Sequence, residues 1–231
     1  MEKVHISSQF DADLEVVRSR LLQMGGMVEE QLRNAIAVYT GADRKLAEQI
    51  KAVEDSINML EIELDHRCTH LIARRQPTAG DLRLIMAVIK ITTDLERVGD
   101  EAAKIGRIAA QMHDQGVVNL FGFSDVHVTA NMAIGMLKDA LDAFARIDSV
   151  AAERIVKQDR QIDNEFRSIL RELITFMMED PRTISTALGV VWIAKALERV
   201  GDHAKNIAEY VIYVADGTDV RHSSTGIESV L

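Results

Sequence analysis

The sequence Leu-Glu-Arg-Val-Gly-Asp occurs twice in this chain, at Leu95–Asp100 and again 102 positions later at Leu197–Asp202. In both copies a glutamate stands four residues before an aspartate, so on a helix the two carboxylates lie one turn apart on the same side. Glycine in a helix interior costs about 1 kcal/mol relative to alanine. The retained Gly99 and Gly201 therefore indicate two helices that a neighbouring helix approaches closely.

The duplication extends beyond the hexamer. Residues 35–54 align with residues 140–159 at an offset of 105 positions, with identities at Ala35/Ala140, Asp43/Asp148, Ala47/Ala152, Glu48/Glu153 and Ile50/Ile155. A repeat of about 100 residues predicts an all-α protein built from two tandem three-helix bundles. We expect the first bundle at residues 1–116, the second at 117–217, and a mobile tail at 218–231.

The composition also favours long helices. Of 231 residues only two are proline and 4% are aromatic, while 47% are hydrophobic and ten are methionine. Proline is excluded from helix interiors and common in loops, so its scarcity indicates few connections. Apolar residues recur at helical spacing. The predicted helices are Asp11–Tyr39, Asp43–Arg74, Asp81–Gln115, Asp125–Arg146, Ser149–Met178 and Arg182–Ala215, with a Gly- and Val-rich link at Gly116–Ser124 between the third and fourth.

Charge and cysteine content exclude several classes of protein. The net charge of −9 and the pI near 5.3 argue against nucleic acid as the main partner, because phosphate neutralisation needs clustered cations. Cys68 is the single cysteine, so there is no intramolecular disulfide. Met1–Phe10 has no secretory signal pattern, and the apolar run Thr183–Ala194 is too short to span a membrane. We expect a cytoplasmic protein.

A helical wheel separates the residues of the first hexamer. Leu95 lies on the apolar face, and Glu96 and Asp100 lie on its flank. A polar stripe runs roughly opposite the predicted core face; it consists of Arg83, Lys90, Asp94, Arg97, Glu101 and Lys104. The second copy repeats the flank position with Glu198 and Asp202.

Each half carries a second row of oxygen side chains. Glu54 and Asn58 lie on the second helix, followed there by Glu61 and Asp65, and Asp159 and Asp163 lie on the fifth. If neighbouring helices are antiparallel, each row faces the carboxylates of the hexamer. Carboxylates that converge repel one another, and a bound cation removes that cost. Oxygen ligands favour hard ions such as Mg²⁺, Ca²⁺, Mn²⁺ or iron. Zinc is a further candidate for the bound ion.

Two other interpretations of the acidic residues stay open. In the structural one, the carboxylates are solvated or paired with Arg97 and Arg199, as is common for such pairs on helices. In the other, Glu63-x-x-His66 belongs to a di-iron site. Such sites need two Glu-x-x-His steps, and the chain has one, which argues against oxidase chemistry.

Two short features also have two readings each. Gly25-Gly26, in the middle of the first helix, permits either a kink or a close helix crossing. Arg74-Arg75, which precede Pro77, form either the polar end of the second helix or a small basic contact.

Several segments together resemble the PhoU family. They are "MGGMVEEQL", "RRQPTAGDLRLIMAVIK" leading into "DLERVGD", "LDAFARID", and "MMEDPRTI" before "LERVGDHAKNIAEY", in this order from Ile6 to His222. The resemblance implies two tandem three-helix bundles and a regulator without enzymatic activity. It implies a link between PstB, the ATPase of the phosphate transporter, and the sensor kinase PhoR when phosphate is plentiful. The implied outcome is repression of the phosphate-starvation regulon and restraint of uptake.

The resemblance also implies metal binding, homodimers, and membrane contact only through partners. By position, the first metal site uses Glu54, Asn58, Glu96 and Asp100, and the second uses Asp159, Asp163, Glu198 and Asp202. Asn58 departs from the family motif, which has aspartate there. A neutral amide is a weaker ligand, so we expect the first site to bind less tightly. A metal-dependent phosphoester hydrolase at these acidic residues is the alternative function, although we find no convincing general base or nucleophile.

Overall fold

The structure is a computed structural model and describes residues 8–41, 44–114 and 124–220. Its helices are α1 (Ser8–Gly41), α2 (Arg44–Arg75), α3 (Ala79–Asp114), α4 (Ser124–Arg146), α5 (Ser149–Glu179) and α6 (Ile184–Asp216), with a short 3₁₀ turn η1 (Pro181–Thr183) before α6. Every helix end lies within three residues of its predicted position. Residues 116–123 of the predicted link and 221–231 of the predicted tail lie outside the described ranges.

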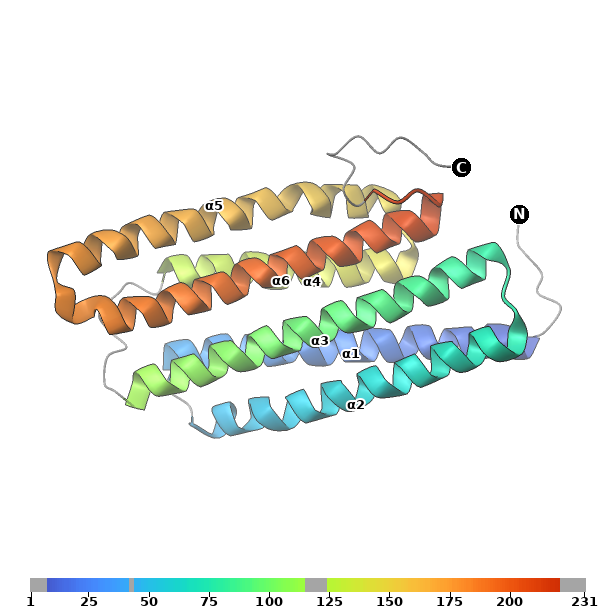
Figure 1. Ribbon diagram of the computed structural model, residues 1–231, viewed down its shortest axis with the longest axis horizontal. Helices are drawn as coiled ribbons and strands as arrows, with labels where there is room; N and C mark the ends of the chain where they lie inside the picture. The colour runs from blue at the N-terminus through green and yellow to red at the C-terminus, as the bar shows by residue number, and fades with distance from the viewer. Residues whose placement is uncertain (1–7, 42–43, 115–123, 221–231) are drawn as a thin grey trace.

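The six helices form two three-helix bundles that lie side by side (Figure 1). In the first, α1, α2 and α3 pack against one another, and α4, α5 and α6 do so in the second. Buried side chains are spread along both bundles and form one continuous core. The predicted all-α fold of two tandem bundles is confirmed. Within the described residues, no helix is long and apolar enough to cross a membrane.

Helix ends follow local hydrogen bonding. The Thr78 hydroxyl donates to the Asp81 carboxylate at 2.6 Å where α3 begins. At the other end of the bundle pair, Asp180 accepts from the backbone N–H of Arg182 at 3.0 Å, and this cap starts η1 rather than α6 itself. Helix α6 ends at Gly217, whose φ of 73° is the left-handed conformation that glycine adopts without strain.

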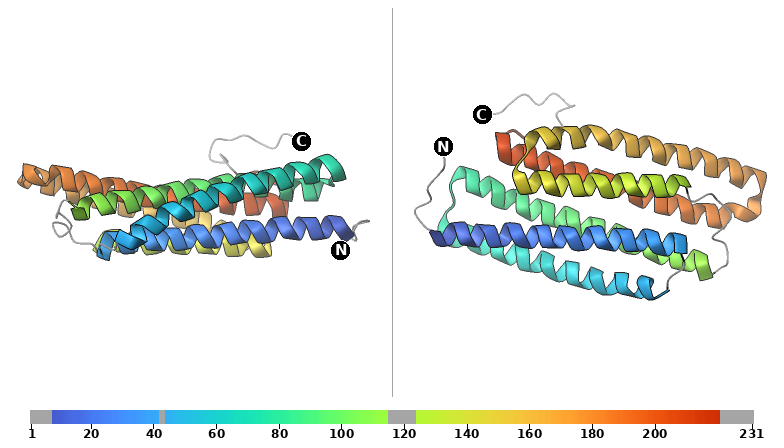
Figure 2. Two further views of the ribbon diagram at one scale, coloured as in Figure 1. Left: turned by 90° about the horizontal axis from the view of Figure 1, so that it is seen from below. Right: turned by 180° about the vertical axis from the view of Figure 1, so that it is seen from behind.

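The two bundles meet mainly where α3 lies antiparallel to α6, with α1 against α4 on the opposite side (Figures 1 and 2). Asp94 is buried there: its carboxylate accepts from Nδ2 of Asn206 at 3.1 Å and lies 2.7 Å from Nδ1 of His203. Glu101 is also buried and forms an ion pair with Arg199. The polar stripe predicted opposite the core of α3 is thus partly an interface with the second bundle.

Gly25 of α1 lies directly against Leu141 of α4. A Cβ atom placed on Gly25 would lie 2.7 Å from Cδ1 and 2.8 Å from Cδ2 of Leu141. The next residue, Gly26, is exposed, and a Cβ there would meet no atom within 4 Å. Since α1 continues through both glycines, the close-crossing interpretation holds for Gly25.

The two adjacent glycines give a matched pair of substitutions. We expect Gly26→Ala to stabilise the protein by about 0.5–1 kcal/mol, because alanine is the better helix former. Gly25→Ala should destabilise it by about 1–3 kcal/mol, because the methyl group overpacks against Leu141. Urea unfolding followed by circular dichroism measures both changes. Equal stabilisation by the two substitutions would contradict the close crossing.

Candidate metal centres between paired helices

The acidic residues face one another because α2 and α5 pack closely over the glycines of the two hexamers. A Cβ atom on Gly201 would lie 2.9 Å from Cδ1 of Ile162, and one on Gly99 would lie 3.4 Å from Cδ1 of Ile57. The two isoleucines are 105 positions apart, as the repeat requires. The close approach predicted from the glycines is therefore found at Gly201. At Gly99 a Cβ atom would make ordinary contact with Ile57 and would lie 3.3 Å from Oε1 of Gln31.

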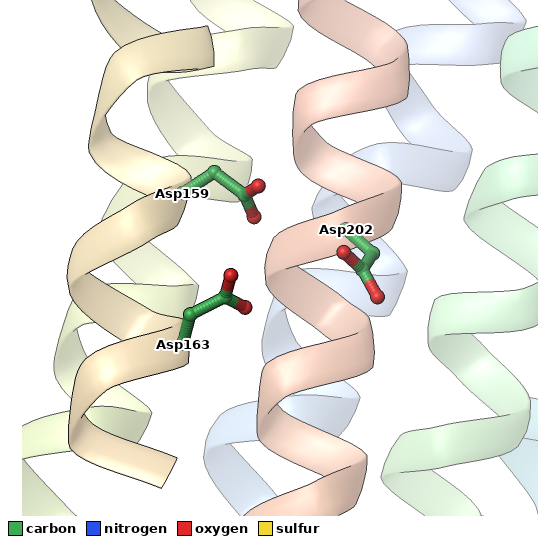
Figure 3. A group of neighbouring side chains, drawn as sticks. All are labelled: Asp159, Asp163 and Asp202. Atoms are coloured by element: carbon green, nitrogen blue, oxygen red, sulfur yellow. The ribbon is translucent and has the colours of Figure 1, made fainter. Parts of the chain in front are cut away.

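Three carboxylates converge in the second bundle. Asp159 and Asp163 project from α5 toward α6, which carries Asp202 (Figure 3). One carboxylate oxygen from each residue lies within 4.8 Å of the other two. Among the described side chains, only this group brings three metal-binding atoms so close together. We name it the α5–α6 acidic group.

Negative charges crowd Asp202. Partial burial of this carboxyl raises its pKa, and the neighbouring charges of Glu198, Asp159 and Asp163 raise it further. The side chain still has substantial contact with solvent, which screens part of the repulsion. The sign of the shift means that the ionised form is less favourable in the folded protein than in a free chain.

Two lysines neutralise part of this charge. Nζ of Lys205 donates to Oδ2 of Asp159 at 2.8 Å, and this bond raises the pKa of Lys205. Nζ of Lys195 donates to both oxygens of Glu198 at 2.6 Å. Glu198 is thus held by a lysine rather than being part of the α5–α6 acidic group. The spacing of three residues along a helix could have predicted the Lys195–Glu198 pair, whereas the Lys205–Asp159 bond joins two helices.

The remaining oxygens fit a cation. Oδ1 of Asp159 is buried without a hydrogen-bond partner among the described residues. No salt bridge in the described part of the chain involves Asp163 or Asp202. Buried carboxylate oxygens are normally bonded, so Oδ1 of Asp159 has an unused ligand position. Two oxygens on one Ca²⁺ stand no more than about 5 Å apart, and on Mg²⁺ about 4 Å. The three oxygens lie within 4.8 Å of one another, which is close to the range for oxygens that share one hard cation.

The first bundle has an acidic group at the equivalent place. Burial raises the pKa of Glu54, and Asp100 on the facing helix raises it further. Burial likewise raises the pKa of Glu96, with added repulsion from Asp100 and from Glu61. Rows on α2 and α3 therefore do face each other. Asn58, the fourth residue predicted here, is partly buried on α2, one residue after Ile57. Glu61, which is not among the four predicted ligands, also lies close enough to raise the pKa of Glu96.

Arg97 covers this first group. Its guanidinium lies 3.5 Å from a Glu96 oxygen and 3.9 Å from an Asp100 oxygen. This agrees with the structural interpretation for the first bundle. Arg199, at the equivalent position of α6, pairs instead with Glu101 of α3. The same sequence position therefore serves the acidic group in one half and the contact between bundles in the other.

Comparison with known proteins gives one consistent result. The profile of the PhoU domain matches residues 21–109 and 127–211. A Pseudomonas putida protein, the phosphate-specific transport system accessory protein PhoU homolog, is 50% identical over 94% of this chain and 85% of its own. The accessory protein PhoU of Escherichia coli K12 is 43% identical over 94% of this chain and 90% of its own.

Solved structures agree. The crystal structure of PhoU from Pseudomonas aeruginosa superposes with a TM-score of 0.88 at 47% identity, covering 90% of this chain and all of that one. The phosphate transport system regulatory protein PhoU from Streptococcus pneumoniae gives a TM-score of 0.84 at 28% identity, over 91% of this chain and 99% of its own. With both bundles matched by the family profile and with relatives this similar over nearly its whole length, the chain belongs to the PhoU family.

Proposed function

We propose that this protein regulates phosphate uptake and represses the phosphate-starvation regulon when phosphate is plentiful. The observation that carries the proposal is the match of nearly the whole chain to accessory proteins of the phosphate-specific transport system, at 43–50% identity. In the finer form of the proposal, the protein couples PstB, the transporter ATPase, to the sensor kinase PhoR. Its contact with the membrane is then only through these partners.

Exposed apolar side chains on the two hexamer helices support a role in protein contacts. Ile184, Leu188 and Trp192 are exposed at four-residue spacing along α6. The equivalent positions of the first repeat, Leu82 and Met86, are exposed on α3. Exposed apolar residues grouped on one face favour binding of another protein. Such stripes suit both a partner of the transport system and the second copy of a homodimer.

The proposed role is regulatory rather than enzymatic. The relatives carry the names of accessory or regulatory proteins, which do not support the phosphoester hydrolase alternative. An assay of purified protein with phosphoester substrates, with and without Mn²⁺, separates the two functions. Turnover that disappears in Asp202→Ala would favour the enzyme.

Deletion of the gene in the host organism tests the regulatory role. We expect the starvation genes to stay active in high phosphate, because the repressing link is gone, and a plasmid copy should restore repression. Reporter expression under high and low phosphate measures the effect.

PstB and the cytoplasmic part of PhoR should be recovered with tagged protein from the complemented strain. Normal repression in the deletion strain would contradict the proposal.

We further propose that both acidic groups bind metal ions and that the second binds more tightly. Asp159, Asp163 and Asp202 would hold the ion in the second bundle, with Glu198 joining them if Lys195 moves aside. In the first bundle the ligands would be Glu54, Asn58, Glu96 and Asp100. The unpartnered Oδ1 of Asp159 supports the second centre, whereas Arg97 and the neutral amide of Asn58 weaken the first. Calcium, manganese, magnesium, iron and zinc are all candidates.

The raised pKa of Asp202 predicts the effect of Asp202→Asn in metal-free protein. Because the folded state holds the proton more tightly than the unfolded chain, this carboxyl contributes most to stability below its ordinary pKa of about 3.9. That contribution is lost as the pH rises through the raised pKa. Asp202→Asn should therefore raise the melting temperature at pH 7, and the gain should shrink toward pH 4. Thermal melts in EDTA measure it, with Asp139→Asn as an exposed control that should change little.

If the α5–α6 acidic group binds a metal ion, substituting two of its ligands should remove the stabilisation that added metal gives. Adding Ca²⁺ or Mn²⁺ should raise the melting temperature of the natural protein, since a ligand of the folded state stabilises it. Asp159→Asn with Asp163→Asn should abolish most of that rise and lower the bound metal measured by elemental analysis. Asp139→Asn with Asp142→Asn removes the same charge from exposed positions on α4 and should keep the rise. Unchanged metal content in the ligand variant would exclude these carboxylates.

A further inference from the structure

A basic cleft lies between the first half of α1 and the end of α2, in a part of the molecule that the proposed function does not use. Its volume is about 550 Å³, within the range typical of small-molecule sites. The wall from α2 carries His66, Arg67, His70, Arg74 and Arg75. Such a concentration of basic groups is unusual on a chain with a net charge of −9. The cleft includes the Arg74-Arg75 pair whose role was left open above.

These basic groups are only partly neutralised. Arg67 is held by Glu63 at 2.7 Å, but Arg75 lies 3.6 Å from Asp13, a distance too long for a hydrogen bond. Asp13 is the single carboxylate in the lining. Arg74 forms no salt bridge with any described residue. The guanidinium of Arg74, with that of Arg75 beside it in a long ion pair with Asp13, matches the oxygens of a phosphate group with paired N–H donors.

The arrangement follows from the helix period. His66, His70 and Arg74 are spaced by four residues, so they form one row along α2. Arginines in the last turn also offset the negative end of the α2 dipole, which explains Arg74 and Arg75 in part. It does not explain the basic groups one and two turns earlier, nor the hollow that they share with α1.

Apolar side chains form the other part of the lining. Val17 and Leu71 are buried, and Val16 is exposed beside them. A single inorganic phosphate would leave most of the volume empty and the exposed Val16 side chain uncovered. We propose that the cleft binds a small organic phosphate, with the phosphate group at the arginines and an apolar or aromatic body against the valines and Leu71. A nucleotide has this chemistry in its phosphates and its aromatic base, and a phospholipid has it in its phosphate and its acyl chains.

The site is separate from the acidic groups. Glu61, the residue of the first acidic group nearest to the cleft, precedes Arg74 by thirteen residues, about 20 Å along the axis of α2. The inference therefore does not depend on metal binding or on the regulatory role. In EDTA, phosphate binding at the cleft is measured without binding at the acidic groups, because no metal ion is available to bridge a phosphate to the carboxylates.

Calorimetric titration of the full chain with ATP in EDTA is the test. We expect saturable binding at one site and at least a tenfold loss of affinity in Arg74→Gln with Arg75→Gln. Arg167→Gln with Arg171→Gln removes two exposed arginines from α5 and should change the affinity less than twofold. Circular dichroism verifies that both variants are folded. Parallel arms use inorganic phosphate and vesicles containing phosphatidylglycerol.

The arms identify the source of the phosphate. ATP binding that depends on Arg74 and Arg75 supports a soluble organic phosphate. Vesicle binding with the same dependence, without ATP binding, supports a lipid headgroup. Inorganic phosphate that binds as tightly as ATP overturns the role of the apolar lining. The inference is also wrong if no probe binds, or if the α5 control loses as much affinity as the cleft variant.

Discussion

Both acidic groups depend on a contact between an isoleucine and a glycine. Ile57 packs over Gly99 in the first bundle, and Ile162 packs over Gly201 in the second. A side chain at Gly201 would require Ile162 to shift, because a Cβ atom there would lie 2.9 Å from its Cδ1. The packing holds two carboxylate rows close together despite their repulsion. Burial and this repulsion together raise the pKa values of Glu54, Glu96 and Asp202. Apolar packing of this kind is what makes a crowded acidic site possible in a small helical bundle.

The two halves use this shared geometry differently. In the first, Arg97 lies over its own acidic group. In the second, lysines cover only part of the charge, while Arg199 reaches Glu101 in the other bundle. Glu101 follows Asp100 directly, and Arg199 follows Glu198. The contact between the bundles is thus made by residues adjacent in sequence to both acidic groups.

Much of the fold and part of the site were predictable from local pattern. The apolar period predicts the helix ends to within three residues, because this signal acts within one helix. The duplicated Glu-x-x-x-Asp step, with its glycine, also indicated where close helices and facing carboxylates would occur. Burial of Asp94 and Glu101 was missed. A wheel drawn for one helix shows a polar stripe but not the second bundle that covers it.

The sequence by itself determined the helices, their duplication and the facing of acidic rows, since all three follow from spacing along the chain. Only the tertiary structure decided which oxygens converge. Asp159, Asp163 and Asp202 meet, whereas Glu198 is held by Lys195. It likewise decided that basic side chains of α2 share a cleft with α1. The physical reason is that side chains from different helices meet only through the packing between helices, and spacing along one helix does not specify it.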